Sequence, residues 1–134
     1  MNLLLDTHIL LWALSDDEKL SDTARKMILD PENTVYYSVV SIWEISIKHT
    51  IRPDNVVFSG KEIMQYCRDA GYLALDLQEK HIASLETLKR KETAKPHHDP
   101  FDRMLIAQAK TEKMTFITHD SLLPDYQEKC IYRV

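Results

Sequence analysis

Short strand-like runs alternate with helix-like stretches along the whole chain. Apolar, β-branched or aromatic runs predict five strands, at residues 2–5, 35–39, 72–75, 115–118 and 130–132. Apolar residues at helical spacing predict helices within residues 9–14, 22–29, 41–48, 60–70, 79–88 and 100–113. This alternation is typical of a mainly parallel sheet covered by helices on both faces. The sequence therefore predicts a single α/β domain over residues 1–134, with three α/β/α layers.

The composition narrows the class of protein. With 134 residues, 44% of them hydrophobic and only two glycines, the chain is long enough for a core and unlike a linker or a repeat array. The formal net charge of −4 excludes a protein that is basic overall, so a nucleic-acid partner would need a local basic patch. No apolar run has the length of a membrane span, and none follows a basic segment as in a signal peptide. We therefore expect a cytoplasmic protein without membrane contact.

The cysteines give no sign of a metal site or a disulfide framework. Cys67 and Cys130 are far apart, and neither belongs to a CxxC pair or a His/Cys cluster with zinc spacing. Two buried free thiols are the expectation for a reducing compartment.

A well-formed helix start lies at Asp99-Pro100-Phe101-Asp102. Asp99 is a good N-cap, Pro100 suits the first helical position, and the carboxylate of Asp102 suits the free N–H groups of the first turn. One interpretation is a capped core helix. The other is that Asp102 projects into an acidic site, and the choice depends on the other carboxylates.

Four carboxylates occupy comparable places. Asp6 ends the first strand, Glu44 and Asp102 lie near the starts of helices, and Asp120 follows the fourth strand. Strand ends and the following helix starts share one edge of a parallel sheet, where ligands bind. Clustered carboxylates repel one another unless cations hold them, and oxygen ligands suit Mg²⁺ or Mn²⁺. The order of these residues therefore predicts one metal site that can activate a water for phosphodiester hydrolysis.

Each carboxylate also has a purely structural interpretation. Glu44 can close a capping box with Ser41, Asp102 can complement the helix dipole, and Asp120 can form a turn. Asp6 has the weakest structural explanation, because it directly follows a buried leucine run. The coincidence of four acids carries more weight than any one of them.

Four segments, in this order, resemble the PIN-domain ribonucleases and most of all the VapC-type toxins of type II toxin–antitoxin systems. The segments are LLLDTH (3–8), SIWEI (41–45), DPFDRMLIAQA (99–109) and FITHD (116–120). The resemblance covers essentially the whole chain. It implies a PIN-like fold and a Mg²⁺- or Mn²⁺-dependent endoribonuclease in which Asp6, Glu44 and Asp102 are the central acids and Asp120 is a more variable fourth. It also implies a homodimer and inhibition by an antitoxin that occupies the cleft.

Asp99 lies so close to Asp102 that the sequence alone does not decide which of them faces the metal. Asp102 is favoured as the ligand because it directly precedes the apolar helix run, which leaves the capping role to Asp99. On the resulting interpretation, Asp6 and Asp102 hold the ion, and Glu44 and Asp120 complete the shell or orient the water.

Several neighbours are candidates for supporting roles. Thr7 and Thr118 are placed to hydrogen-bond the metal-bound carboxylates. Arg103, Lys95 and Lys91 are candidates for holding the RNA backbone, with a solvated basic loop as the alternative. His8, His97, His98 and His119 are candidates for contacting phosphate or acting as acids, but we expect surface or packing roles for each of them. Trp12, Trp43 and Tyr36 are expected to make core or dimer contacts.

Two other functions stay open. An aspartyl-phosphate phosphotransferase would use Asp6 as its nucleophile, but position 8 is His rather than a second acid and no Lys follows Ile117. A catalytically weak PIN-like module that only binds RNA or protein is the other alternative, and the four intact acids speak against it. The RNA target and the antitoxin cannot be read from this chain.

Overall fold

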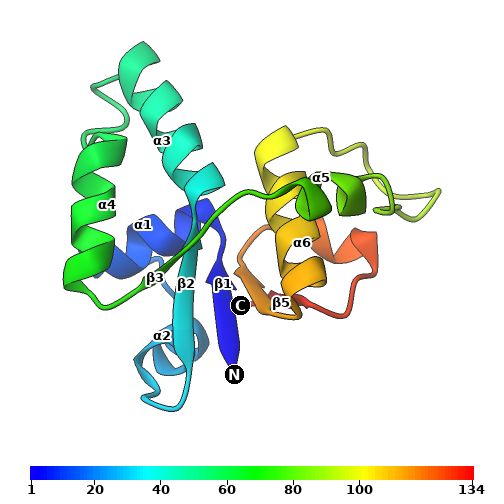
Figure 1. The fold of residues 1–134 in the computed structure, drawn as a ribbon, viewed down its shortest axis with the longest axis horizontal. Helices are drawn as coiled ribbons and strands as arrows, with labels where there is room; N and C mark the ends of the chain where they lie inside the picture. Colours follow the sequence, from blue (N-terminus) through cyan, green and yellow to red (C-terminus); the bar gives the residue numbers. More distant parts are fainter.

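The computed structural model describes residues 1–134 and contains one five-stranded sheet in the order β3-β2-β1-β4-β5 (Figure 1). The strands are β1 (Asn2–Leu5), β2 (Thr34–Ser38), β3 (Leu73–Leu75), β4 (Thr115–Thr118) and β5 (Ile131–Arg133). Every pair of neighbouring strands is parallel. The predicted parallel sheet is therefore confirmed, with strand ends within one residue of the prediction.

Six α-helices and one 3-10 helix connect the strands. They are α1 (Thr7–Ser15), α2 (Asp22–Leu29), α3 (Val39–Ile51), α4 (Gly60–Asp69), α5 (Glu79–Leu85), α6 (Pro100–Glu112) and the 3-10 helix η1 (Leu123–Tyr126). Helix α5 ends three residues before the predicted end. None of the helices combines the length and apolar composition needed to cross a bilayer. Both cysteines are free thiols, but only Cys67 is buried as expected, whereas Cys130 is half-buried.

Two apolar cores lie on opposite faces of the sheet. Successive side chains of a strand point to opposite faces, so Leu3 and Leu5 pack with α1 to α4, whereas Leu4 packs with α6 and η1. The view in Figure 1 shows the same division, with α1, α3 and α4 on one side of the strands and α5 and α6 on the other. The predicted three-layer α/β/α arrangement is confirmed.

Strand β1 is the centre of the sheet and the point where the strand order reverses. The chain proceeds from β1 to β2 and β3 on one side, then returns to place β4 on the other side of β1. Leu3, Leu4 and Leu5 are fully buried, which explains their continuous apolar run. In open α/β sheets, ligands bind at the carboxyl edge beside such a reversal. Asp6, the residue after β1, lies at this edge.

Helix α3 begins earlier than the sequence predicted. Ser38, the last residue of β2, caps it by accepting a hydrogen bond from the Val40 N–H at 3.0 Å. Ser41 is therefore inside the helix, so the predicted helix start at Ser41 is wrong, and the alternative in which Glu44 closes a capping box with Ser41 is excluded. Because α3 starts at Val39, Glu44 lies in its second turn, where its side chain is free for contacts beyond the helix.

Helix α6 begins as the sequence predicted. Asp99 Oδ1 accepts hydrogen bonds from the N–H groups of Phe101 at 2.9 Å and Asp102 at 3.1 Å, and Pro100 occupies the first position. Leu105 and Ala109 on the inner side of the helix are fully buried. The first turn is thus anchored from both its cap and its apolar face, which fixes the direction of Asp102.

Gly60 allows α4 to approach α3 closely. A Cβ at this position would clash with Ser46 Oγ and lie 3.2 Å from the carbonyl oxygen of Ile42. We expect Gly60→Ala to destabilise the fold by about 1–3 kcal/mol, because the helix backbone cannot move away freely. Thermal unfolding measures this, and Ser46→Ala in the same chain should recover part of the loss. Equal stability of Gly60→Ala and the parent chain would show that the close approach is not needed.

Candidate active site

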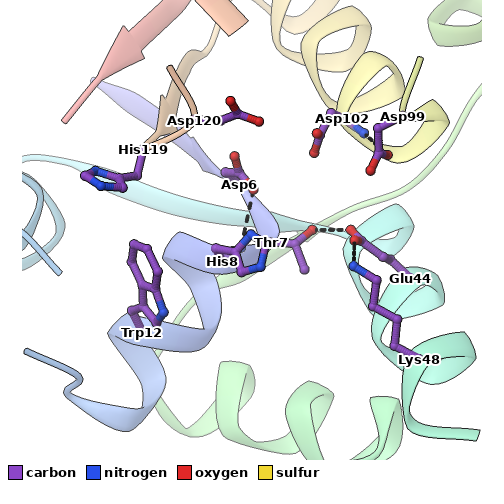
Figure 2. A pocket seen from close by; sticks show the side chains of 10 residues that line it. All are labelled: Asp6, Thr7, His8, Trp12, Glu44, Lys48, Asp99, Asp102, His119 and Asp120. Carbon is purple, nitrogen blue, oxygen red and sulfur yellow. Dashed lines mark hydrogen bonds and ion pairs between the residues drawn. The ribbon is translucent and has the colours of Figure 1, made fainter. Parts of the chain in front are cut away.

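A cleft of about 400 Å³ opens at the carboxyl edge of the sheet. Ten residues line it: Asp6, Thr7, His8, Trp12, Glu44, Lys48, Asp99, Asp102, His119 and Asp120. Figure 2 shows the carboxylates of Asp6, Asp102 and Asp120 pointing toward one another, with Glu44 beside them. The four acids singled out in the sequence therefore line a single cleft, although they come from four separate parts of the chain.

Asp6 is held at the end of β1 by hydrogen bonds from both sides. Its exposed fraction is 4%, Thr118 Oγ1 donates to its Oδ2 at 2.6 Å, and the His8 N–H donates to its Oδ1 at 3.3 Å. Thr118 Oγ1 also accepts from the Asp120 N–H at 3.1 Å. One hydroxyl thus fixes Asp6 and the turn that carries Asp120.

Glu44 is buried, and each of its two carboxylate oxygens has a hydrogen-bond partner. Thr7 Oγ1 donates to its Oε1 at 2.8 Å, and Lys48 Nζ lies 2.5 Å from its Oε2. Partial burial favours the neutral amine of Lys48, but the hydrogen bond and charge of Glu44, together with Asp99 and Asp102, raise the pKa of Lys48. Lys48 therefore stays charged and neutralises one acid of the cleft.

The other carboxylates of the cleft have too little positive charge nearby to balance their negative charges. Burial, followed by the charges of Asp6, Asp99, Glu44 and Asp120, raises the pKa of Asp102 to about 8. Burial also raises the pKa of Asp6, and the hydrogen bond from Thr118 only partly offsets it. Several carboxylates with hard oxygen donors and too few cations are the donor set that Mg²⁺ and Mn²⁺ prefer. The residues present therefore fit a divalent cation.

Asp99 and Asp102 both line the cleft, but they are differently occupied. Asp99 uses its Oδ1 to cap α6 and keeps its other oxygen free. Asp102 projects from the first turn of the helix, with its Oδ2 3.2 Å from His97 Nε2. The capping role of Asp99 is confirmed. The charges of the other carboxylates help to raise the pKa of Asp102.

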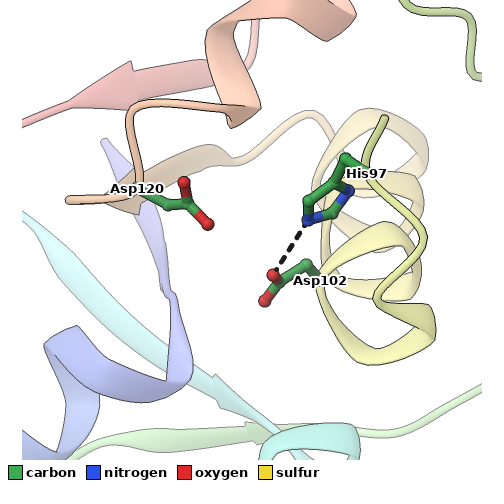
Figure 3. Close-up of side chains that lie close together, drawn as sticks. All are labelled: His97, Asp102 and Asp120. Atoms are coloured by element: carbon green, nitrogen blue, oxygen red, sulfur yellow. Dashed lines mark hydrogen bonds and ion pairs between the residues drawn. The ribbon is translucent and has the colours of Figure 1, made fainter. Parts of the chain in front are cut away.

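His97 and Lys48 are residues beside the acids whose places the sequence did not reveal. His97 is 9% exposed, and its Nδ1 lies 2.7 Å from Tyr126 Oη. Burial lowers the pKa of His97, so the ring is neutral at pH 7. Donor atoms of His97, Asp102 and Asp120 all lie within 4.8 Å of one another (Figure 3). In the sequence, His97 is simply a histidine shortly before the helix cap Asp99, with no spacing that marks it as part of a site. Its contact partner Tyr126 lies 29 residues further along the chain.

The residues predicted to hold RNA lie outside the lining of the cleft. Arg103 Nη1 donates to Tyr126 Oη at 3.3 Å, and its guanidinium carbon lies 5.7 Å from the centre of the Tyr126 ring. Lys91 and Lys95 are exposed on the loop before α6, with Lys91 Nζ 4.0 Å from Asp125. Their contact with RNA stays a prediction.

Comparisons with known proteins agree with this geometry. The family profile of the PIN domain matches residues 3–129. The fold is similar to that of a chain in the crystal structure of VapBC2 from Rickettsia felis bound to a DNA fragment from their promoter. That similarity has a TM-score of 0.69 at 15% sequence identity and covers 100% of this chain and 99% of that chain. Comparison with curated protein sequences found no match. Because the profile match spans nearly the whole sequence, the chain belongs to the PIN-domain family.

Proposed function

We propose that this PIN domain is a Mg²⁺- or Mn²⁺-dependent endoribonuclease and the toxin of a toxin–antitoxin pair. The observation that carries the proposal is the convergence of Asp6, Glu44, Asp102 and Asp120 in one cleft at the carboxyl edge of the sheet. Membership of the PIN-domain family and the fold shared with a chain of the VapBC2 structure support it.

Each acid has a role in this proposal. Asp6 and Asp102 hold the cation, while Glu44 and Asp120 complete its shell or orient the attacking water. A bound divalent cation supplies Lewis acidity at the scissile phosphate and lowers the pKa of a water. Thr118 and Thr7, through their hydrogen bonds, keep the oxygens of Asp6 and Glu44 in fixed positions.

The acidic cleft needs positive charge beside it to accept RNA. Lys48 lies at the cleft wall, and Arg103, Lys95 and Lys91 belong to α6 and the loop before it, where they contact the RNA backbone in this proposal. These side chains bind phosphates, which every RNA offers, so they do not define the sequence that is cleaved.

The proposal also includes protein partners, namely an antitoxin and a second copy of the chain. Trp43, Ile47 and Ile51 form an exposed apolar stripe along α3, with exposed fractions of 58%, 36% and 70%. Trp43 is thus exposed rather than part of the core, and it packs edge-on against Phe101. Exposed apolar surface of this kind supports association with an antitoxin or a second copy of the chain.

A cleavage assay with controlled metal tests the proposal. We expect the purified protein to cut RNA in Mg²⁺ or Mn²⁺, to stop in EDTA, and to recover when excess Mn²⁺ is restored, because Lys48 balances only one of the carboxylates in the cleft. Gel analysis of end-labelled RNA follows the cuts. RNA that is bound but stays uncut with Mn²⁺ would instead indicate a binding module. Cleavage that persists in EDTA would rule out the role given to the acids.

A further inference from the structure

His97 adds a nitrogen donor to the carboxylates of the cleft. Its Nε2 lies 3.2 Å from Asp102 Oδ2, within the group that also includes Asp120. Neighbouring ligands of one ion, each about 2.1 Å from it, are separated by about 3.0 Å in octahedral and about 3.4 Å in tetrahedral geometry. The observed separation, which is that of a hydrogen bond in the metal-free protein, also suits two ligands of the same ion.

The surroundings of His97 orient its ring toward the acids. Tyr126 Oη lies 2.7 Å from His97 Nδ1, 3.4 Å from the carbonyl oxygen of His97 and 3.3 Å from Arg103 Nη1. All three contacts are satisfied when Nδ1–H and Arg103 donate to Tyr126 Oη and the Tyr126 hydroxyl donates to the carbonyl. This tautomer leaves the lone pair of Nε2 facing carboxylate oxygens, an arrangement that needs a proton or a cation between them.

A hydrogen bond from the far nitrogen of the ring is the usual support of a histidine that binds metal. Here Tyr126 accepts that bond, and its ring packs at 88° to the imidazole with the centroids 5.5 Å apart. Arg103 in turn fixes the Tyr126 hydroxyl. The ring of His97 is thus held in one orientation by residues that do not line the cleft.

We propose that His97 is a metal ligand together with Asp102 and Asp120, and that its nitrogen makes the site prefer a transition-metal ion such as Mn²⁺ over Mg²⁺. Imidazole nitrogen suits first-row transition metals, whereas Mg²⁺ prefers oxygen and its own waters. The proposal adds a ligand to the metal dependence proposed above, but metal binding by itself tests it.

Pulsed electron paramagnetic resonance of the Mn²⁺-loaded protein gives a direct test. Nitrogen-14 coupling to the metal is expected in the parent chain, and its frequencies should change when histidine is labelled with nitrogen-15. His97→Gln should abolish the coupling, weaken Mn²⁺ binding by about 10–100-fold in calorimetry, and weaken Mg²⁺ binding much less. His119→Gln and His8→Gln are matched controls, because both histidines line the cleft and should keep the coupling.

A second variant guards against a folding defect in His97→Gln. Tyr126→Phe keeps the imidazole but removes the hydroxyl that orients it, so Mn²⁺ affinity should fall by about tenfold while nitrogen coupling remains. Bound Mn²⁺ without nitrogen coupling, or coupling that survives His97→Gln, would overturn this inference and leave the nuclease proposal intact. No Mn²⁺ binding at all would contradict both, and Mn²⁺ binding with this coupling but without RNA cleavage would contradict only the nuclease.

Discussion

Replacing Asp6 with Asn is expected to lower the rate of RNA cleavage by at least about 100-fold while the fold survives. Asn has almost the shape of Asp and can still accept the hydrogen bond from Thr118, so we expect the fold to tolerate the loss of the longer bond from the His8 N–H. What is lost is the charge that holds the divalent cation in the proposed nuclease, and effects of this size are typical when a charged group of a reaction centre is removed. Initial rates on a fixed RNA at saturating Mn²⁺ measure the loss.

The control for this experiment is an acid outside the cleft. Asp69 is exposed at the end of α4 and hydrogen-bonds only Gln65 in its own helix, so Asp69→Asn should cleave at the parent rate. Circular dichroism and thermal unfolding establish that both variants are folded. If folded Asp6→Asn retains the parent rate, Asp6 has no part in the reaction.

The second large effect is on stability. Asp102 has a pKa of about 8 in the folded chain against an ordinary value of 3.8, so between about pH 4 and pH 8 the folded state holds a proton that the unfolded state has lost. The metal-free protein should therefore become less stable as the pH rises through this range. Asp102→Asn removes the buried charge, and we expect it to stabilise the metal-free protein at pH 8 by about 2–3 kcal/mol, or about 5–10 °C in Tm.

Thermal unfolding in EDTA between pH 5 and pH 9 measures this effect. The parent chain should lose stability across the series and Asp102→Asn should lose less, with a remaining slope from Asp6, whose pKa burial also raises. Adding Mn²⁺ should stabilise the parent chain and have little effect on Asp102→Asn, because ligands stabilise only the state that binds them. Identical pH profiles for the two proteins would show that the charge of Asp102 does not destabilise the folded state.

Local patterns were sufficient to predict most of the fold and the acids of the cleft. The leucine run before Asp6 predicted a buried parallel strand because both faces of β1 are covered. Asp99-Pro100 predicted the start of α6 because capping depends on neighbouring residues only. Once the strands were known to be parallel, their ends had to share one edge. The convergence of Asp6 and Asp102 therefore followed from topology rather than from any single motif.

Features that depend on distant contacts were not predictable. Ser41 and Glu44 match a capping box, but Ser38 starts α3, and it also hydrogen-bonds Gln108 of α6 across the fold at 2.5 Å. His97 gives no periodic or spacing signal, because its place depends on Tyr126. The helix start was wrongly predicted, whereas for His97 the expected packing role did not reveal that the ring lies beside Asp102.

The position of β4 beside β1 determines when, during synthesis, the acids of the cleft can come together. Asp6 leaves the ribosome 112 residues before its hydrogen-bond partner Thr118, and β4 is the last strand to pair with the centre of the sheet. Asp102 and Asp120 also belong to the final third of the chain. A nascent chain that stops before β4 lacks Asp120 and the hydroxyl that fixes Asp6. We therefore expect the proposed nuclease to stay inactive until the ribosome has passed β4 and Asp120, which separates the synthesis of Asp6 from the onset of RNA cleavage.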